Sequence, residues 1–582
     1  MTGREEGAGS RDGAPRLGRA DLWVGAGIVA LQLGLMFLAF VPAPHSGGDN
    51  AGYLGLAHSL LERGAYLDLY LPGEPIHTKY PPLFAGLLAA AYLLGARTWV
   101  AFKAVPALAT TAAVVLTYLW VRERRGPALA ASVAFLVAAS SAVVYYSHWI
   151  LSDPPFLALT LFALWALARA ERPEAAAEEG GEARDGDGVL RVPWLLLGCF
   201  AAILAYFTRS AGLPLVVAVA LWLGLRRRWL PLAGFGAAFG VPALLWWLRG
   251  RNAPGEGSYL TELWLQDPYR PELGRAGPVD FVGRVGRNAV GYVGEHIPTG
   301  ITGLPGPPAT VLGVAVVGLA AWGWYRRFRE DRGPAELFAP LYLGLLLLWP
   351  VVWSGDRFAL PLIPLLLFYG VDGLGAAFRR LHPRAPLAVG ATGLLLLGLP
   401  ALASWGEDAR AASACRSRAD QGPWACTGQR MAEFAAAARW SGEQLPQGAV
   451  VVSRKPRIFY VLSGVKSEIY PLSREPDEFF ARAGELGARY LVLDVLDNLS
   501  RYYAAAVIQA RPGAFCPLAA FGEEGGPRTR VLGILPGGEG AGASPGDAAR
   551  LSPCPEGLRR GEPRSLPAYS SFRVPLLGGS AP

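Results

Sequence analysis

Two acidic and two basic residues stand beside long apolar runs of this chain, where a charge needs a reason. Asp49 follows the first apolar run, Asp153 begins a later one, and Arg209 and Arg357 occupy short segments between others. An ionisable group against hydrocarbon costs on the order of 3 kcal/mol. A carboxylate can take a proton from a hydroxyl, and arginine binds phosphate through charge-assisted hydrogen bonds. These residue types indicate acid–base and phosphate chemistry at a membrane surface.

The composition fixes the class of protein that must position these residues. Of 582 residues, 52% are hydrophobic and only 17% are charged. A chain this apolar is not a soluble protein, and its length exceeds that of one ordinary domain. We therefore expect an integral membrane protein.

Apolar runs of helix-forming length recur through the first two thirds of the chain. A helix needs about 20 apolar residues to cross about 30 Å of hydrocarbon, which predicts about eleven spans. They lie near 22–41, 100–121, 128–147, 155–169, 193–207, 213–225, 230–249, 308–325, 336–353, 358–376 and 386–404. The apolar segment 81–95 is too short to cross, and we expect it to be a helix along the outer membrane surface.

The arginines set the expected orientation, because short cytoplasmic loops are enriched in Lys and Arg. Arginines precede the first span and fill every second connection, at 122–125, 226–228, 326–329 and 379–384. The N-terminus is then cytoplasmic, whereas the Asp49 loop and everything after residue 404 are extracytoplasmic. A cleaved signal peptide is the alternative interpretation of the first span. The net charge of +8 follows from the loop arginines, so no nucleic-acid partner is needed.

Four regions follow from these patterns. Residues 1–20 form a disordered cytoplasmic N-terminus, 21–404 the membrane domain with a first outer loop at 42–99, 405–535 an extracytoplasmic domain, and 536–582 a Gly/Pro-rich tail. Within the membrane domain, 172–190 is a polar, mobile segment, and 250–306 is a long outer loop that is either functional or disordered.

The extracytoplasmic domain carries the alternation of an α/β fold. The runs 449–453 and 489–494 are typical of buried strands, and 476–486 has helical spacing between them. Such alternation predicts strands joined by helices.

The cysteines agree with an oxidising face. Cys415, Cys426, Cys516 and Cys554 all follow residue 404, and Cys199 lies within a span. Four cysteines outside predict two disulfides, with Cys415–Cys426 the favoured local pair. Zinc is the competing interpretation, but the spacing of a zinc site is missing.

Each charged residue also has an interpretation without chemistry. Asp49 can cap the helix that follows it, and Asp153 can do the same at the start of its span. Arg209 can extend toward the membrane surface, and Arg357 can pair locally with Asp356. Chemistry is favoured because topology delivers two carboxylates and two arginines to one face.

The ordered set of motifs resembles bacterial polytopic glycosyltransferases of the GT-C fold, over residues 20–405. The resemblance is to the protein O-mannosyltransferases (dolichyl-phosphate-mannose-protein mannosyltransferases) and the lipid A aminoarabinose transferases. It is carried by Asp49-x-x-x-Tyr53-x-x-x-Ala57, Gly64-x-Tyr66, Tyr80-Pro-Pro-Leu83, Ser152-Asp153, Thr208-Arg209 and Arg357-Phe-x-Leu-Pro361-Leu-x-Pro364.

The resemblance implies a site and an activity. Asp49 would be the catalytic base or orient the acceptor, and Asp153 would be the second acidic residue. The groups that would bind the phosphate-bearing lipid donor are Lys79, Tyr80, Lys103, Arg209 and Arg357. Asn50 stands where many relatives have Glu, and Tyr80 separates Lys79 from the Pro-Pro pair.

The expected fold is a polytopic α-helical, GT-C-like membrane protein of the cell (inner) membrane with a C-terminal α/β domain. The expected activity is inverting transfer of a sugar from a polyprenyl-phosphate donor to a glycan, lipid or protein acceptor outside the membrane. No cofactor is required, and a divalent metal is an option. Two other classes stay open: a lipid or solute transporter, which would place charges near the bilayer midplane, and a membrane anchor for the outer domain.

Overall fold

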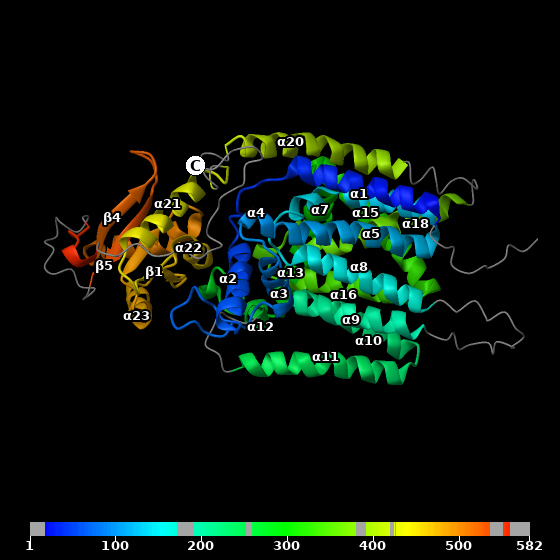
Figure 1. Cartoon of the computed structure of the whole chain (residues 1–582), viewed down its shortest axis with the longest axis horizontal. Coiled ribbons are helices and arrows are strands. Elements are labelled where there is room, and N and C mark those ends of the chain that lie inside the picture. Colours follow the sequence, from blue (N-terminus) through cyan, green and yellow to red (C-terminus); the bar gives the residue numbers. More distant parts are fainter. Residues whose placement is uncertain are drawn as a thin grey trace, which may run out of the picture.

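The computed structural model describes residues 18–171, 191–251, 259–379, 392–418, 424, 426–535 and 551–558. Of the segments expected to be mobile, residues 1–17 of the N-terminal 1–20 and all of 172–190 lie outside the described residues, whereas Arg19 and Ala20 are already helical. The tail from 536, apart from 551–558, also lies outside them. In Figure 1 the long helices run side by side, and a small sheet lies beyond one end of them.

The first ten expected spans correspond to helix in the structure, and so does the described part of the last one, 386–404, of which residues 386–391 lie outside the described residues. The helices are α1 (Arg19–Ala39), α4 and α5 (Trp99–Phe102 and Ala104–Arg125), α6 and α7 (Pro127–Ala139 and Ser141–Tyr146), α8 (Asp153–Ala170), α9 (Val192–Thr208), α10 (Leu213–Leu225), α11 (Trp229–Gly250), α15 (Pro307–Glu330), α16 (Pro334–Leu348), α17 and α18 (Asp356–Ala359 and Ile363–Arg379), and η6 with α20 (Leu394–Gly398 and Leu399–Arg416).

Five of these segments are long and apolar enough to cross a membrane, judged by length and composition over the described residues. They are Arg19–Ala39, Trp99–Arg125, Trp229–Gly250, Pro307–Glu330 and Asp356–Ala376. The bundle also leaves large apolar side chains uncovered, including Leu230 and Trp247 of α11 at 85% and 61% exposure. Such a surface is stable against hydrocarbon rather than water.

The two ends of the bundle differ in how their charges are arranged. At the end away from the sheet, arginines pair with carboxylates of neighbouring helices. The pairs are Arg122–Asp21 at 2.7 Å, Arg124–Glu336 at 2.7 Å and Arg125–Asp372 at 2.5 Å. We call this the arginine end and the opposite one the sheet end.

Short helices occupy the connections at the sheet end. The first loop folds into α2 (Gly48–Arg63) and α3 (Pro82–Leu93), so most of the segment 81–95, expected to be a helix, is helical. The long connection after α11 contains α12 (Tyr259–Trp264), α13 (Pro278–Gly291), a π-helix η3 (Tyr292–His296) and α14 (Ile297–Thr302). Its described part is therefore largely helical.

The C-terminal sheet has five strands in the order β2-β1-β3-β5-β4. Two strands and a helix predicted from the sequence are present as β1 (Val450–Val452), β3 (Tyr490–Leu493) and α23 (Pro476–Leu486). Strand β2 (Lys466–Glu468) pairs parallel with β1, as does β3, whereas β4 (Phe515–Phe521) and β5 (Thr529–Ile534) add an antiparallel edge. With α21 (Gln429–Gln444), α22 (Pro456–Ser463) and the π-helix η8 (Ser500–Ala504) with α24 (Ala505–Ala510), these strands form the sheet unit, residues 429–534.

The first loop and the sheet unit share one hydrophobic core. Buried side chains of α2, α3 and α4 cluster with buried side chains of α21, α22 and the strands. The members include Ala51, Leu54, Phe84, Leu88 and Trp99 from the first loop and Phe434, Val451, Ile458, Phe459 and Val492 from the sheet unit. The loop that carries Asp49 is thus packed into the sheet unit.

Two disulfides fasten the C-terminal part. Cys415 is bonded to Cys426, and Cys516 of β4 is bonded to Cys554. Cys199 is a free cysteine of α9. The pairing favoured from the sequence is present, and the second bond joins the two remaining outer cysteines.

Candidate active site

Four of the predicted residues meet at the sheet end of the bundle. Asp49 lies in the first turn of α2, and Asp153 is the first residue of α8. Arg209 follows α9, and Arg357 lies in α17. Helices that run in alternate directions bring these four short connections to the same end, so residues far apart in sequence come into contact. We call Asp49, Asp153, Arg209 and Arg357 the charged cluster.

Arg357 joins the two carboxylates. Its Nη1 donates to Asp49 Oδ2 at 2.9 Å, and its Nε donates to Asp153 Oδ2 at 2.8 Å. A guanidinium offers several donors in a fixed plane, so one arginine can hold two carboxylates at a set spacing. The distance between the two acids is therefore controlled by a third residue.

Arg209 holds Asp153 from the other side. Its Nη1 lies 2.7 Å from Asp153 Oδ1. The Asp153 side chain is 4% exposed, so its charge is compensated inside the protein by two arginines. Buried carboxylates persist only when they are paired in this way. Asp153 is consequently a structural centre of the cluster.

Asp49 has a different environment and remains accessible. Its side chain is 34% exposed, and its Oδ1 accepts a hydrogen bond from the Tyr80 hydroxyl at 2.8 Å. Burial acts to raise the pKa of Asp49, but the charges of Arg357 and Arg457 and the hydrogen bonds outweigh it and hold the pKa well below its usual value. Asp49 is therefore ionised and accessible, and it can accept a hydrogen bond from a hydroxyl group.

Aromatic side chains link the two halves of the cluster. The rings of Tyr53 and Tyr80 stack at 4.8 Å, and the Tyr53 hydroxyl lies 2.9 Å from Ser152 Oγ. Ser152 directly precedes Asp153. The stack fixes the position of the Tyr80 hydroxyl beside Asp49.

The interpretations without chemistry do not describe these side chains. The N-cap of α2 is Gly47 and that of α8 is Ser152, and neither forms a side-chain capping bond. Asp356 accepts the backbone N–H of Arg357 at 2.8 Å and the Tyr146 hydroxyl at 2.9 Å, while the Arg357 guanidinium bonds to Asp49 and Asp153 instead. Capping and local pairing therefore leave the charged cluster unexplained.

Two further predicted residues lie apart from the cluster. Lys79 pairs with Glu262 of α12 at 2.5 Å. Lys103 is buried, and its Nζ donates to the carbonyl oxygens of Val41 and Ala43 at 2.5 and 2.7 Å. The structure thus places Lys79 at a contact between two loops and Lys103 at the end of α1.

The surroundings of the cluster are positive. Burial lowers the pKa of His45 to about 4, and the neighbouring charge of Arg357 adds to the effect. Asp49 and Asp153 face Arg209, Arg357 and Arg457, which leaves three cations against two anions. Such a site favours an anionic ligand.

The described residues of the cluster offer few ligands for a metal ion. Its two carboxylates, Asp49 and Asp153, are both held by Arg357. The Asn50 side-chain oxygen, next to Asp49 in the sequence, accepts the backbone N–H of Ile150 at 2.8 Å. Among the described residues, no group of three His, Cys, Asp or Glu side chains is placed to hold a metal.

The sequence analysis missed Arg457, which enters from the sheet unit. Its Nη1 donates to the Tyr80 hydroxyl at 2.6 Å and lies 4.0 Å from Asp49 Oδ1. Arg457 stands at the start of α22, just after the parallel strand β1. Ligands of open α/β sheets bind at the carboxyl ends of strands, and that rule could have drawn attention to it.

Comparison with known proteins establishes the fold. No protein-family model and no curated protein sequence matches the chain. Among solved structures, it is similar to the archaeal oligosaccharyltransferase AglB from Archaeoglobus fulgidus in complex with an inhibitory peptide and a dolichol-phosphate. The two share 13% identity over 88% of this chain and 74% of that one, with a TM-score of 0.53.

A second similar structure is ArnT from Cupriavidus metallidurans bound to undecaprenyl phosphate. It shares 14% identity over 90% of this chain and all of that one, with a TM-score of 0.50. The Archaeoglobus oligosaccharyltransferase with Zn and sulfate is also similar, at 14% identity, 87% and 72% coverage and a TM-score of 0.52. The chain thus has the GT-C membrane fold that the motifs predicted, with a C-terminal sheet.

Proposed function

We propose that the chain is a membrane glycosyltransferase that moves a sugar from a polyprenyl-phosphate donor to an acceptor at the extracytoplasmic face. The observation that carries the proposal is the pairing of an accessible, ionised Asp49 with a cluster that holds an excess of positive charge. The ionised Asp49 can accept a proton from an acceptor hydroxyl, and the excess positive charge can bind a phosphate. The similar structures were solved with undecaprenyl phosphate and dolichol-phosphate, which supports this donor class.

The orientation is part of the proposal. Three arginines of one connection that is expected in the cytoplasm, Arg122, Arg124 and Arg125, pair with carboxylates at the arginine end, and both disulfides lie at the opposite end with the sheet unit. Disulfides form in oxidising compartments, and arginine-rich loops stay in the cytoplasm. Both features favour a charged cluster that faces outward.

The proposed reaction uses Asp49 as the base. The acceptor hydroxyl donates a hydrogen bond to Asp49, its oxygen attacks the anomeric carbon, and the bond from that carbon to the phosphate oxygen breaks. The proton passes to Asp49, and polyprenyl phosphate leaves with the bond's electrons, which inverts the anomeric centre. Arg209 and Arg357 stabilise the charge that develops on the phosphate.

A carboxylate whose pKa is strongly lowered is a weak base. In this site the binding of the donor raises the basicity of Asp49 again. The ion pair with Arg357 is one cause of the low pKa of Asp49. A donor phosphate competes with Asp49 for that guanidinium, so donor binding loosens the ion pair. Oδ2 then becomes free for the acceptor hydroxyl, and the basicity of Asp49 rises when the sugar is in place.

The sheet unit and the long connection after α11 are proposed to select the acceptor, because the connection contacts both the first loop that carries Asp49 and the sheet unit. Lys79 binds Glu262 of α12, and the Tyr503 hydroxyl of the sheet unit donates to the Tyr269 carbonyl at 2.8 Å. Exchange of the sheet unit and this connection together with those of a transferase of known acceptor should change acceptor preference. Unchanged preference would refute this role.

The test is release of polyprenyl phosphate by the purified protein in lipid, from a panel of labelled polyprenyl-phosphate sugars with membrane extract as the acceptor source. Wild type and Glu62→Gln, a control on the same helix whose carboxylate pairs with His58, should release the lipid phosphate, and Asp49→Asn should not. Release from no donor would overturn the proposed activity. Full turnover by a folded Asp49→Asn protein would overturn the role of Asp49.

A further inference from the structure

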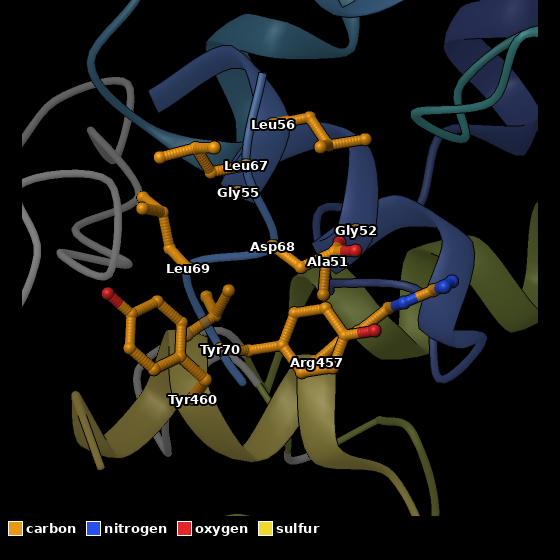
Figure 2. A pocket seen from close by; sticks show the side chains of 11 residues that line it. Ala51, Gly52, Gly55, Leu56, Leu67, Asp68, Leu69, Tyr70, Arg457 and Tyr460 are labelled. Atoms are coloured by element: carbon orange, nitrogen blue, oxygen red, sulfur yellow. The ribbon is translucent and has the colours of Figure 1, made fainter. Parts of the chain in front are cut away.

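An arginine of the sheet unit crosses the first loop to reach the charged cluster. Arg457 begins on α22, and Figure 2 shows its side chain running from α22 past Gly52 of α2. The passage is narrow, since a Cβ atom at Gly52 would lie 3.1 Å from Arg457 Cδ. Between α2, the loop after it and α22 is a pocket whose lining includes Gly52, Gly55, Tyr70 and Arg457 (Figure 2).

The end of this side chain controls a hydrogen bond of Asp49. A phenol oxygen carries one proton and can also accept hydrogen bonds. Arg457 Nη1 donates to the Tyr80 oxygen at 2.6 Å, and an arginine cannot accept in return. The Tyr80 proton is therefore directed to Asp49 Oδ1, where the structure has it at 2.8 Å between oxygens. The direction of the chain is Arg457 to Tyr80 to Asp49.

Other contacts besides Arg457 dock the sheet unit on the first loop. The Ser467 backbone N–H donates to the Tyr70 carbonyl at 2.8 Å, and Lys466 pairs with Glu74 at 2.7 Å. The two parts also share the hydrophobic core described above. Substitution of Arg457 therefore leaves these docking contacts in place.

We infer that Arg457 is a positioning residue for Asp49, so that the sheet unit supplies a working part of the catalytic site. The inference rests on the proposed role of Asp49 as base. Arg457 acts through Tyr80 on the orientation of the carboxylate, and its positive charge keeps Asp49 ionised at acidic pH.

The test measures lipid-phosphate release against pH for Arg457→Gln, Arg457→Lys and a control, Arg454→Gln. Arg454 stands in the same loop but pairs with Asp497 at 2.9 Å within the sheet unit. Arg457→Gln should lower kcat about 10-fold with donor KM nearly unchanged, since misplacement of a reacting group acts on the chemical step. Its acid limb should move up by about one pH unit because a cation beside Asp49 is lost.

The remaining variants separate positioning from general damage. Arg457→Lys should restore the acid limb but only part of kcat, because it returns the charge without the planar donor group. Arg454→Gln should match wild type. Gly52→Ala should shift the acid limb in the same direction as Arg457→Gln, because the added methyl group crowds the Arg457 side chain. Gly55→Ala should not shift it, because a Cβ atom added at Gly55 meets nothing within 4 Å. An unchanged kcat and acid limb in Arg457→Gln would overturn the inference.

A second measurement decides the inference without any turnover. Unfolding temperatures of wild type, Asp49→Asn, Arg457→Gln and the double variant form a double-mutant cycle. The double variant should lose less than the sum of the two single losses, because the second substitution removes a partner already lost. Strict additivity would overturn the coupling. If no donor is turned over but coupling is measured, the proposed activity fails while the link from Arg457 to Asp49 stands.

Discussion

Arg357 and Asp153 lie 204 residues apart in the sequence and meet through a hydrogen bond of 2.8 Å from Nε to Oδ2. The same guanidinium uses a different nitrogen for Asp49. One side chain therefore sets the spacing of both carboxylates. That geometry leads to the first prediction.

Arg357→Lys should be nearly as damaging as Arg357→Gln. A lysine has one nitrogen on a flexible stem and cannot reproduce two directed bonds to two acids. We expect release of polyprenyl phosphate to fall about 100-fold in both variants. Arg410→Lys serves as the control, since Arg410 donates only to a carbonyl of its own helix. Near-normal release by Arg357→Lys would show that charge alone suffices.

Exchanging the charges of Lys79 and Glu262 distinguishes two roles for Lys79, an ion pair that joins two loops and a contact with the donor phosphate. The structure pairs it with Glu262, and both side chains are 15% exposed. Lys79→Glu and Glu262→Lys should each lower release of polyprenyl phosphate about 10-fold, because each places two charges of the same sign side by side in a partly buried contact. The double exchange should recover most of the loss. If the variant with both substitutions releases no polyprenyl phosphate, that result would instead support the phosphate contact that the family resemblance implies for Lys79.

Asp494 makes the stability of the sheet unit depend on pH. Burial raises the pKa of Asp494 from 3.8 to about 6, and the residue is 3% exposed. The folded state then keeps a proton that the unfolded chain releases, so the favourable contribution present below pH 3.8 is lost as pH rises through 6. Asp494→Asn should stabilise by about 1–3 kcal/mol above pH 6 and have no effect below pH 4.

The measurement is the unfolding temperature of both proteins at two pH values. Asp477→Asn is the control, because Asp477 is an exposed carboxylate of the same unit, 85% exposed, that pairs with Arg511 at 2.6 Å. An equal gain for Asp494→Asn at both pH values would show that the effect is not one of titration.

The Cys516–Cys554 bond should be a major source of stability. It joins residues 38 apart, and closing a loop of that length restricts the unfolded chain by about 4 kcal/mol. Cys516→Ala with Cys554→Ala should therefore lower the unfolding temperature clearly, whereas Cys199→Ala should change it little because Cys199 is not bonded. If the thiols of Cys516 and Cys554 both react with a thiol reagent when the protein is unfolded without a reductant, the pairing is contradicted.

Much of the helical architecture was predictable because apolar run length and arginine position follow from the membrane itself. Alternation of the arginine loops placed Asp49, Asp153, Arg209 and Arg357 at one end, and they are in contact there. Strands β1 and β3 were predictable from short aliphatic runs, because buried parallel strands are apolar on both faces.

The missed features depend on partners that no local pattern encodes. Lys79 and Lys103 had the right charge for a phosphate site, but Glu262 and two backbone carbonyls hold them. Arg457 was missed because its contact with Tyr80 arises only when the sheet unit docks on the first loop. The antiparallel edge formed by β4 and β5 was missed since neither strand has strong alternation.

The core shared by the first loop and the sheet unit also sets an order of events during biosynthesis. Tyr80 leaves the ribosome 377 residues ahead of Arg457, which is roughly 20 to 80 s at ordinary translation speed. For that interval α2 and α3 lack the apolar side chains of the sheet unit that they pack against. The newly made protein therefore has the four residues of the charged cluster before it has Arg457, and the hydrogen bond from Arg457 to Tyr80 forms only when the final quarter of the chain has been made.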